Sequence, residues 1–90
     1  MTEDRRTRVK RLRYRSWHRG TKELDLLMGP FADAELEALA DPALDDYEAL
    51  MEAPEPLLYA MLTGKASPPP EYDTATLRRL LTFLERPRRA

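Results

Sequence analysis

The sequence predicts an all-α fold, organised as a single small domain of five helices. Apolar residues recur at helical spacing along nearly the whole chain, and no stretch of four or more residues alternates as a strand would. Glycine and proline stand between these apolar repeats, where helices begin and end. The length of 90 residues suits one domain with a modest core.

The first predicted helix covers about residues 4–18, and it ends where Arg19 is followed by Gly20. Glycine readily takes the left-handed backbone conformation that closes many helices. Thr21 can then cap a second helix, and Glu23 lies in the first turn of that helix, where a negative charge suits the helix dipole. The sequence therefore predicts a tight junction between two helices at this point.

The second helix carries apolar residues at i, i+3, i+4 and i+7 from Leu24, which predicts a continuous buried face. Gly29 and Pro30 interrupt this helix, because Pro30 has no amide hydrogen to donate to the carbonyl four residues earlier. We therefore expect a kink or a fresh helix start there. Across the whole chain, the residues predicted to be largely buried are Val9, Leu12, Leu24, Leu27, Phe31, Leu44, Tyr47, Leu58, Leu62, Leu77, Leu81 and Leu84.

The second half of the chain contains three further predicted helices. Asp41 and Pro42 form a start signal, a capping residue followed by proline at the first helical position. A short fourth helix, rich in leucine and methionine, stops at Gly64. Residues 65–73 contain three consecutive prolines and predict an extended surface loop, and the last helix covers about residues 74–86.

The composition excludes most catalytic and metal sites. The chain has no cysteine, which excludes disulfides, thiolate metal sites and cysteine nucleophiles. His18 is the single histidine, and the three glycines are too scattered for a phosphate-binding loop. We therefore predict that the protein is not an enzyme and has no metal and no cofactor of its own. The longest apolar run is a few residues, so we expect no membrane span.

Charge is segregated along the chain, although the formal net charge is only −1. Residues 1–20 contain eight basic residues (Lys and Arg) and two acidic ones. Residues 21–75 contain two basic and thirteen acidic residues, and residues 76–90 contain five basic residues and one acidic residue. Such asymmetry suggests a bipolar surface and a partner recognised by charge complementarity. Alternatively, the basic ends pair with the acidic middle inside one fold, and the charge pattern is compatible with both interpretations.

The basic first helix also suggests an alternative function, a small RNA-binding module. Its arginines are interleaved with Tyr14 and Trp17, which would suit phosphate contacts and base stacking. A solvated basic face, with both aromatic rings packed against other helices, would give the same pattern. The sequence pI of about 5.8 argues against nucleic-acid binding, because basic binding domains usually exceed a pI of about 9.

The junction between the first two helices is the main candidate site. Arg19 and Glu23 lie four residues apart, where an arginine fork can bind oxygen acceptors and a glutamate can accept from donors. Gly20 between them lets another backbone approach closely. By spacing alone, a simple cap-to-cap connection, with Arg19 and Glu23 paired on the surface, is the favoured interpretation.

Four segments change that balance. They are Arg-Leu-Arg-Tyr-Arg-Ser at residues 11–16, Arg19-Gly20-x-x-Glu23-Leu24-Asp25, Pro30-Phe31 and the acidic third helix. In this order, and together with the length and the absent cysteines, they resemble the small flavinylation factors of succinate dehydrogenase. The resemblance is to the bacterial FAD assembly factor and its mitochondrial counterpart, and it covers about residues 8–86.

The resemblance implies an assembly factor that binds the flavoprotein subunit of succinate dehydrogenase or fumarate reductase. Binding would help a histidine of that subunit to attack the flavin, so the FAD would be attached to the partner and not to this chain. The matching positions are Arg19, Gly20 and Glu23, with Arg13 and Asp25 as neighbours at the interface. The expected location is a bacterial cytoplasm in preference to a mitochondrial matrix.

Overall fold

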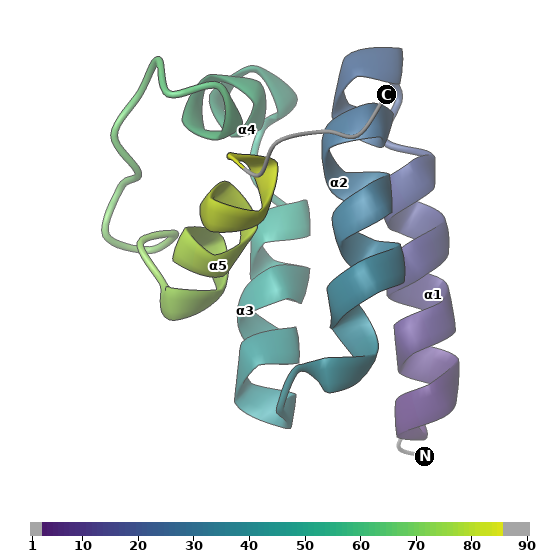
Figure 1. The fold of residues 1–90 in the computed structure, drawn as a ribbon. Coiled ribbons are helices and arrows are strands. Elements are labelled where there is room, and N and C mark those ends of the chain that lie inside the picture. Colours follow the sequence, from purple (N-terminus) through teal and green to yellow (C-terminus); the bar gives the residue numbers. More distant parts are fainter. Residues whose placement is uncertain (1–2, 86–90) are drawn as a thin grey trace. The chain divides into compact units, whose positions relative to one another are not determined.

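The computed structural model describes residues 3–85, and its regular elements there are all helical, with no strand. The elements in chain order are α1 (Arg5–Trp17), α2 (Lys22–Glu35), the 3₁₀ helix η1 (Leu36–Ala38), α3 (Asp41–Met51), α4 (Glu55–Leu62) and α5 (Ala75–Leu84), as Figure 1 shows. The predicted all-α class with five α-helices is confirmed. The chain divides into two compact units, one ending at Leu39 and one beginning at Ala40, and each is described by itself.

The first unit is a pair of helices, α1 and α2, that lie side by side and run in opposite directions (Figure 1). One face of each helix is buried, as the spacing of the apolar residues predicts. The buried residues of this unit are Val9, Leu12 and Ser16 on α1, Leu24, Met28, Gly29, Phe31 and Ala32 on α2, and then Leu36 and Leu39. The Ser16 hydroxyl is satisfied inside α1, where it donates to the Leu12 carbonyl at 2.7 Å.

The α2 helix continues through Gly29 and Pro30, so the expectation of a fresh start at this point is wrong. Pro30 has no amide hydrogen to donate to the Leu26 carbonyl. Leu26 is exposed, so water can hydrate the carbonyl that loses its donor. The helix therefore continues at the cost of a single backbone bond.

Gly29 has a packing role that its position beside proline conceals. A Cβ atom at this residue would lie 2.3 Å from Cδ2 of Trp17, far inside contact distance. The indole ring of Trp17 on α1 therefore lies directly against the α2 backbone. Because only glycine leaves this space, residue 29 sets how closely the two helices approach.

Two acidic residues fix the start of α1. Asp4 is the N-cap, and its Oδ1 accepts a hydrogen bond from the Thr7 amide at 2.8 Å, which holds the pKa of Asp4 below its ordinary value. Glu3 accepts two hydrogen bonds from the guanidinium of Arg11, both at 2.9 Å, and these lower the pKa of Glu3. Arg11 is therefore paired within its own N-terminal segment.

The second unit contains α3, α4 and α5, and α3 packs against α5. Thr76 on α5 donates to the Ala43 carbonyl of α3 at 3.2 Å. The α3 helix has Ala40, not Asp41, as its N-cap, so the predicted start is displaced by one residue. The predicted loop at 65–73 is confirmed as non-helical, and it follows Gly64, which has a φ of 78°.

Nine of the twelve residues predicted to be buried are buried, and three are not. The exceptions, Leu27, Leu81 and Leu84, are partly exposed. Leu81 and Leu84 line an open hollow of about 450 Å³ in the second unit, whereas the neighbouring Leu80 is fully buried. The apolar face of α5 is therefore centred on Leu77 and Leu80. The predicted end of this helix, residue 86, lies outside the described residues.

Candidate partner-binding site

The junction between α1 and α2 is a short turn whose backbone is fixed by hydrogen bonds at both ends. The α1 helix ends at Trp17, and the His18 amide donates to the Arg15 carbonyl at 3.2 Å. Gly20 then takes a φ of 110°, a conformation that residues with a side chain rarely adopt. The positive φ predicted for Gly20 is confirmed, but α1 already ends at Trp17 with His18 as its C-cap, so Gly20 lies in the turn beyond the helix end.

The start of α2 closes the turn from the other side. Thr21 is the N-cap, as predicted, and its hydroxyl accepts from the Leu24 amide at 3.3 Å. The carboxylate of Asp25 reaches back and accepts from the Arg19 backbone amide at 2.6 Å. Asp25 therefore ties the first turn of α2 to the residue that precedes Gly20, which gives this carboxylate a structural contact.

The predicted site residues differ in how far solvent reaches them. Gly20 and Glu23 are exposed, and Arg19, Asp25 and Arg13 are partly buried. An exposed glycine backbone beside an exposed carboxylate leaves room for another chain to approach. The junction thus presents the exposed carboxylate of Glu23 beside the exposed Gly20, on a turn that internal hydrogen bonds hold in place.

Arg13 belongs to a different group of residues, further back along α1. Its guanidinium lies 3.4 Å from Oδ1 of Asp33 and 3.5 Å from Oε1 of Glu37, which come from α2 and η1. The same Asp33 accepts from the indole nitrogen of Trp17, with both carboxylate oxygens at 3.2 Å. The structure therefore brings Arg19, Gly20, Glu23 and Asp25 to one junction, and it pairs Arg13 with the side of α2.

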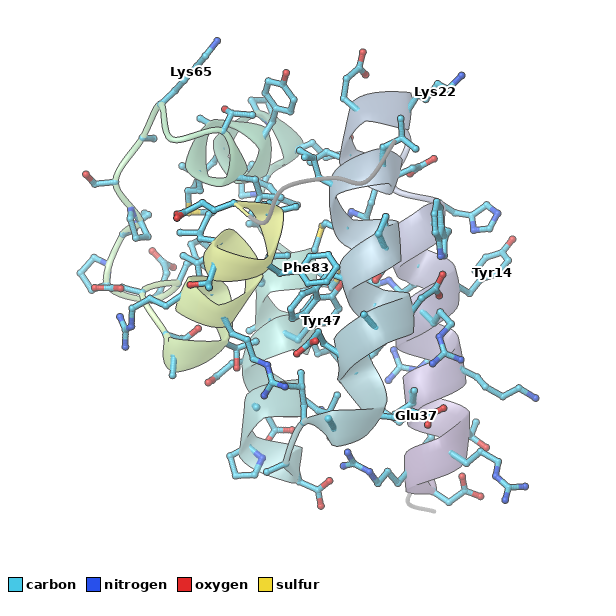
Figure 2. The ribbon with its side chains drawn as sticks, in the orientation of Figure 1. Tyr14, Lys22, Glu37, Tyr47, Lys65 and Phe83 are labelled. Atoms are coloured by element: carbon cyan, nitrogen blue, oxygen red, sulfur yellow. The ribbon has the colours of Figure 1, made fainter. Side chains whose placement is uncertain are left out.

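Sequence reasoning missed an exposed aromatic pair next to the junction. The rings of Tyr14 and His18 stack with centroids 4.0 Å apart and planes inclined by 16°. His18 Nδ1 lies 2.8 Å from the Tyr14 carbonyl, an arrangement in which Nδ1 carries the hydrogen and donates. Tyr14 is 64% exposed and projects away from α1 in Figure 2. The sequence could have indicated this pair, because Tyr14 and His18 are four residues apart and side chains at that spacing are neighbours on a helix.

Nothing in the described part of the chain resembles a metal centre or a membrane span. Residues 3–85 contain no group of three or more histidine, aspartate or glutamate side chains placed to hold a metal ion. Within the same range, no helix is long and apolar enough to cross a bilayer. The geometry of the junction suits binding and positioning of a partner, since charged groups on a rigid turn can hold another polypeptide segment in place.

The sequence matches a known family along most of its length. Residues 10–84 match the family described as the flavinator of succinate dehydrogenase. These comparisons give the RNA-binding alternative no support. No solved structure matches the chain.

Named relatives come from bacteria and from eukaryotes. The chain is 39% identical over 74 residues to an FAD assembly factor of Acetobacter pasteurianus, covering 82% of this chain and 68% of that protein. It is 38% identical over 69 residues to a mitochondrial succinate dehydrogenase assembly factor of Dictyostelium discoideum, covering 77% of this chain and 49% of the relative. The chain thus spans about two thirds of the bacterial relative and about half of the Dictyostelium relative. The match across residues 10–84 and these identities together show that the chain belongs to the family of succinate dehydrogenase flavinators.

Proposed function

We propose that this protein binds the flavoprotein subunit of succinate dehydrogenase and promotes the covalent attachment of FAD to that subunit. The observation that carries the proposal is the family match over residues 10–84. The names of the relatives, an FAD assembly factor and succinate dehydrogenase assembly factors, support the same partner and the same cofactor. The flavoprotein of fumarate reductase is a second substrate under this proposal.

The junction is the proposed contact surface, with Arg19, Gly20 and Glu23 as its central residues. Glu23 offers a carboxylate to donors of the partner, and Gly20 lets the partner's backbone approach without a side chain between them. Asp25 acts mainly by holding the Arg19 amide, and Arg13 by anchoring α1 to α2. A preorganised turn of this kind loses little entropy on binding, which favours affinity.

The protein's own role is non-catalytic under this proposal, since the chemistry needs the flavin and a nucleophile of the partner. The factor would hold the partner in a conformation that brings these two groups together. It would carry no FAD of its own. A bacterial cytoplasm is the proposed location, supported by the bacterial relative, while the mitochondrial relatives point to the matrix as the alternative.

A reconstitution with purified components tests this function directly. The flavoprotein subunit, made in cells that lack any flavinylation factor, is incubated with FAD with and without this protein. We expect covalent flavin on the subunit, seen as in-gel fluorescence and as added mass, to form much faster with the factor. The factor's own mass should not change. Equal rates with and without the factor would contradict the proposal.

A further inference from the structure

A basic hollow of about 430 Å³ opens on the first unit, beside the N-terminal half of α1. Four cations, one acid and one buried valine line the hollow. Its lining residues are Val9, Arg5, Arg6, Lys10, Arg13 and Glu37. It lies away from the junction, and its lining residues do not include Arg19, Gly20 or Glu23, the central residues of the contact surface proposed above.

Two of the four cations are used to build the wall of the hollow. Arg5 donates to the backbone carbonyl of Glu37 at 3.1 Å and also to the carbonyl of Leu39. Arg13 reaches the carboxylates of Asp33 and Glu37. These contacts tie α1 to the segment that follows α2, so the wall of the hollow is fixed within the first unit.

The other two cations, Arg6 and Lys10, point to a ligand. Both are exposed, and across residues 3–85 neither side chain forms an ion pair. They are four residues apart on one helix, so their Cβ atoms lie about 6 Å from each other. Two positive charges at this spacing suit a ligand that carries two separate anionic groups.

The composition of the hollow favours an extended acidic peptide over a compact polyanion. Glu37 lines the same hollow and would repel a dense charge such as a phosphate group. An extended peptide can place its carboxylates near Arg6 and Lys10 and keep them away from Glu37. The excess of cations in the first 20 residues would also steer such a segment toward α1.

An exposed ridge on α1 connects this hollow to the junction. Arg6, Lys10, Tyr14 and His18 follow each other at intervals of four residues, and all four are exposed. Residues at this interval form one of the surface ridges of an α-helix. From Lys10 to the end of α1 at Trp17, the seven-residue rise is about 10 Å, so the hollow and the junction fit within the width of an ordinary protein interface.

We propose that the basic hollow receives an acidic segment of the flavoprotein partner, with its carboxylates on Arg6 and Lys10, as a second contact beside the junction. This inference rests on the proposed function, because it takes the partner from there. The α1 ridge then lies beneath the partner from the hollow to the Tyr14–His18 stack. The basic first helix thereby acquires a role in recognising a protein.

Charge reversal at Lys10 tests the inference against a matched control. Lys10→Glu and Lys65→Glu make the same change at two exposed lysines, and Lys65 projects from the loop of the second unit (Figure 2). Glutamate at position 10 can pair with Arg6 and Arg13, so the helix should stay stable. Affinity for the purified flavoprotein subunit is measured by titration calorimetry at low and high salt, with Glu23→Ala in parallel.

We expect Lys10→Glu to weaken binding about threefold to tenfold at low salt and less at high salt, with Lys65→Glu at the wild-type level. If Glu23→Ala weakens binding while Lys10→Glu matches Lys65→Glu, the hollow is not a contact and the proposed function survives. If the wild-type protein does not bind the subunit, both proposals fail. Strong Lys10-dependent binding of a generic single-stranded RNA, without an effect on the subunit, would overturn the choice of a protein segment.

Discussion

The side of the α1–α2 pair and the junction that connects the two helices use charged residues in opposite ways. Along the side of the helix pair, Trp17 lies against Gly29 and, with Arg13, contacts Asp33. At the junction, Glu23 and Gly20 face solvent, while the backbone beneath them is held by internal hydrogen bonds. Residue type does not separate these regions. The difference is that the charged side chains along the side of the pair contact residues of the same chain, whereas Glu23 at the junction faces solvent.

The largest effect on stability is expected at Gly29. Gly29→Ala places a Cβ atom 2.3 Å from the Trp17 ring, so the helices must separate or the indole must move. We expect a loss of about 1–3 kcal/mol in the free energy of unfolding, measured by urea denaturation. The loss should be smaller in a Trp17→Leu background, where the ring is absent. Equal losses in both backgrounds would show that the indole does not pack on Gly29.

A smaller effect is expected at Asp33. Asp33→Ala removes the acceptor of the Trp17 indole and an ion-pair partner of Arg13, and should cost about 0.5–1.5 kcal/mol. Asp33→Asn keeps an acceptor for the indole and should cost less. The urea midpoints of the two variants measure the difference. If Asp33→Ala left the urea midpoint unchanged, the contacts of Asp33 with Trp17 and Arg13 would not stabilise the fold, which would contradict the contrast with the junction.

The start of α1 gives a pH-dependent control that leaves the junction untouched. The hydrogen bond from Thr7 lowers the pKa of Asp4 in the folded state, so the cap stabilises the protein above the ordinary aspartate pKa of about 4. This contribution is lost as the pH falls through the lower, folded-state pKa. The difference in thermal midpoint between wild type and Asp4→Ala should therefore narrow as the pH falls below about 4. A difference that is constant from pH 7 to pH 2 would contradict this assignment.

The sequence was sufficient for local features and insufficient for contacts between helices. The cap at Thr21 and the positive φ of Gly20 follow from residue types at neighbouring positions. The role of Gly29 does not, because it depends on a tryptophan twelve residues earlier in the chain. Rules for single helices therefore predict an interruption at Gly29 and Pro30, whereas α2 continues through both residues.

The candidate site shows the same limit. The motif of Arg19, Gly20 and Glu23 is visible in the sequence, and so is its place between two helices. The hydrogen bond from the Arg19 amide to Asp25 and the separate pairing of Arg13 require coordinates. Among the α5 leucines, a small error in helix phase was enough to exchange the fully buried Leu80 for the partly exposed Leu81.

Glu23→Ala distinguishes a junction that serves a partner from one that serves the fold. The measurement is covalent flavin on the partner subunit, read as in-gel fluorescence in cells lacking the natural factor, beside the thermal midpoint of the purified variant. Because Glu23 is exposed, its loss should cost about 0–1 kcal/mol, a small shift in midpoint. We predict that flavinylation nonetheless falls strongly. Full flavinylation with Glu23→Ala, or a loss that only accompanies unfolding, would contradict the account.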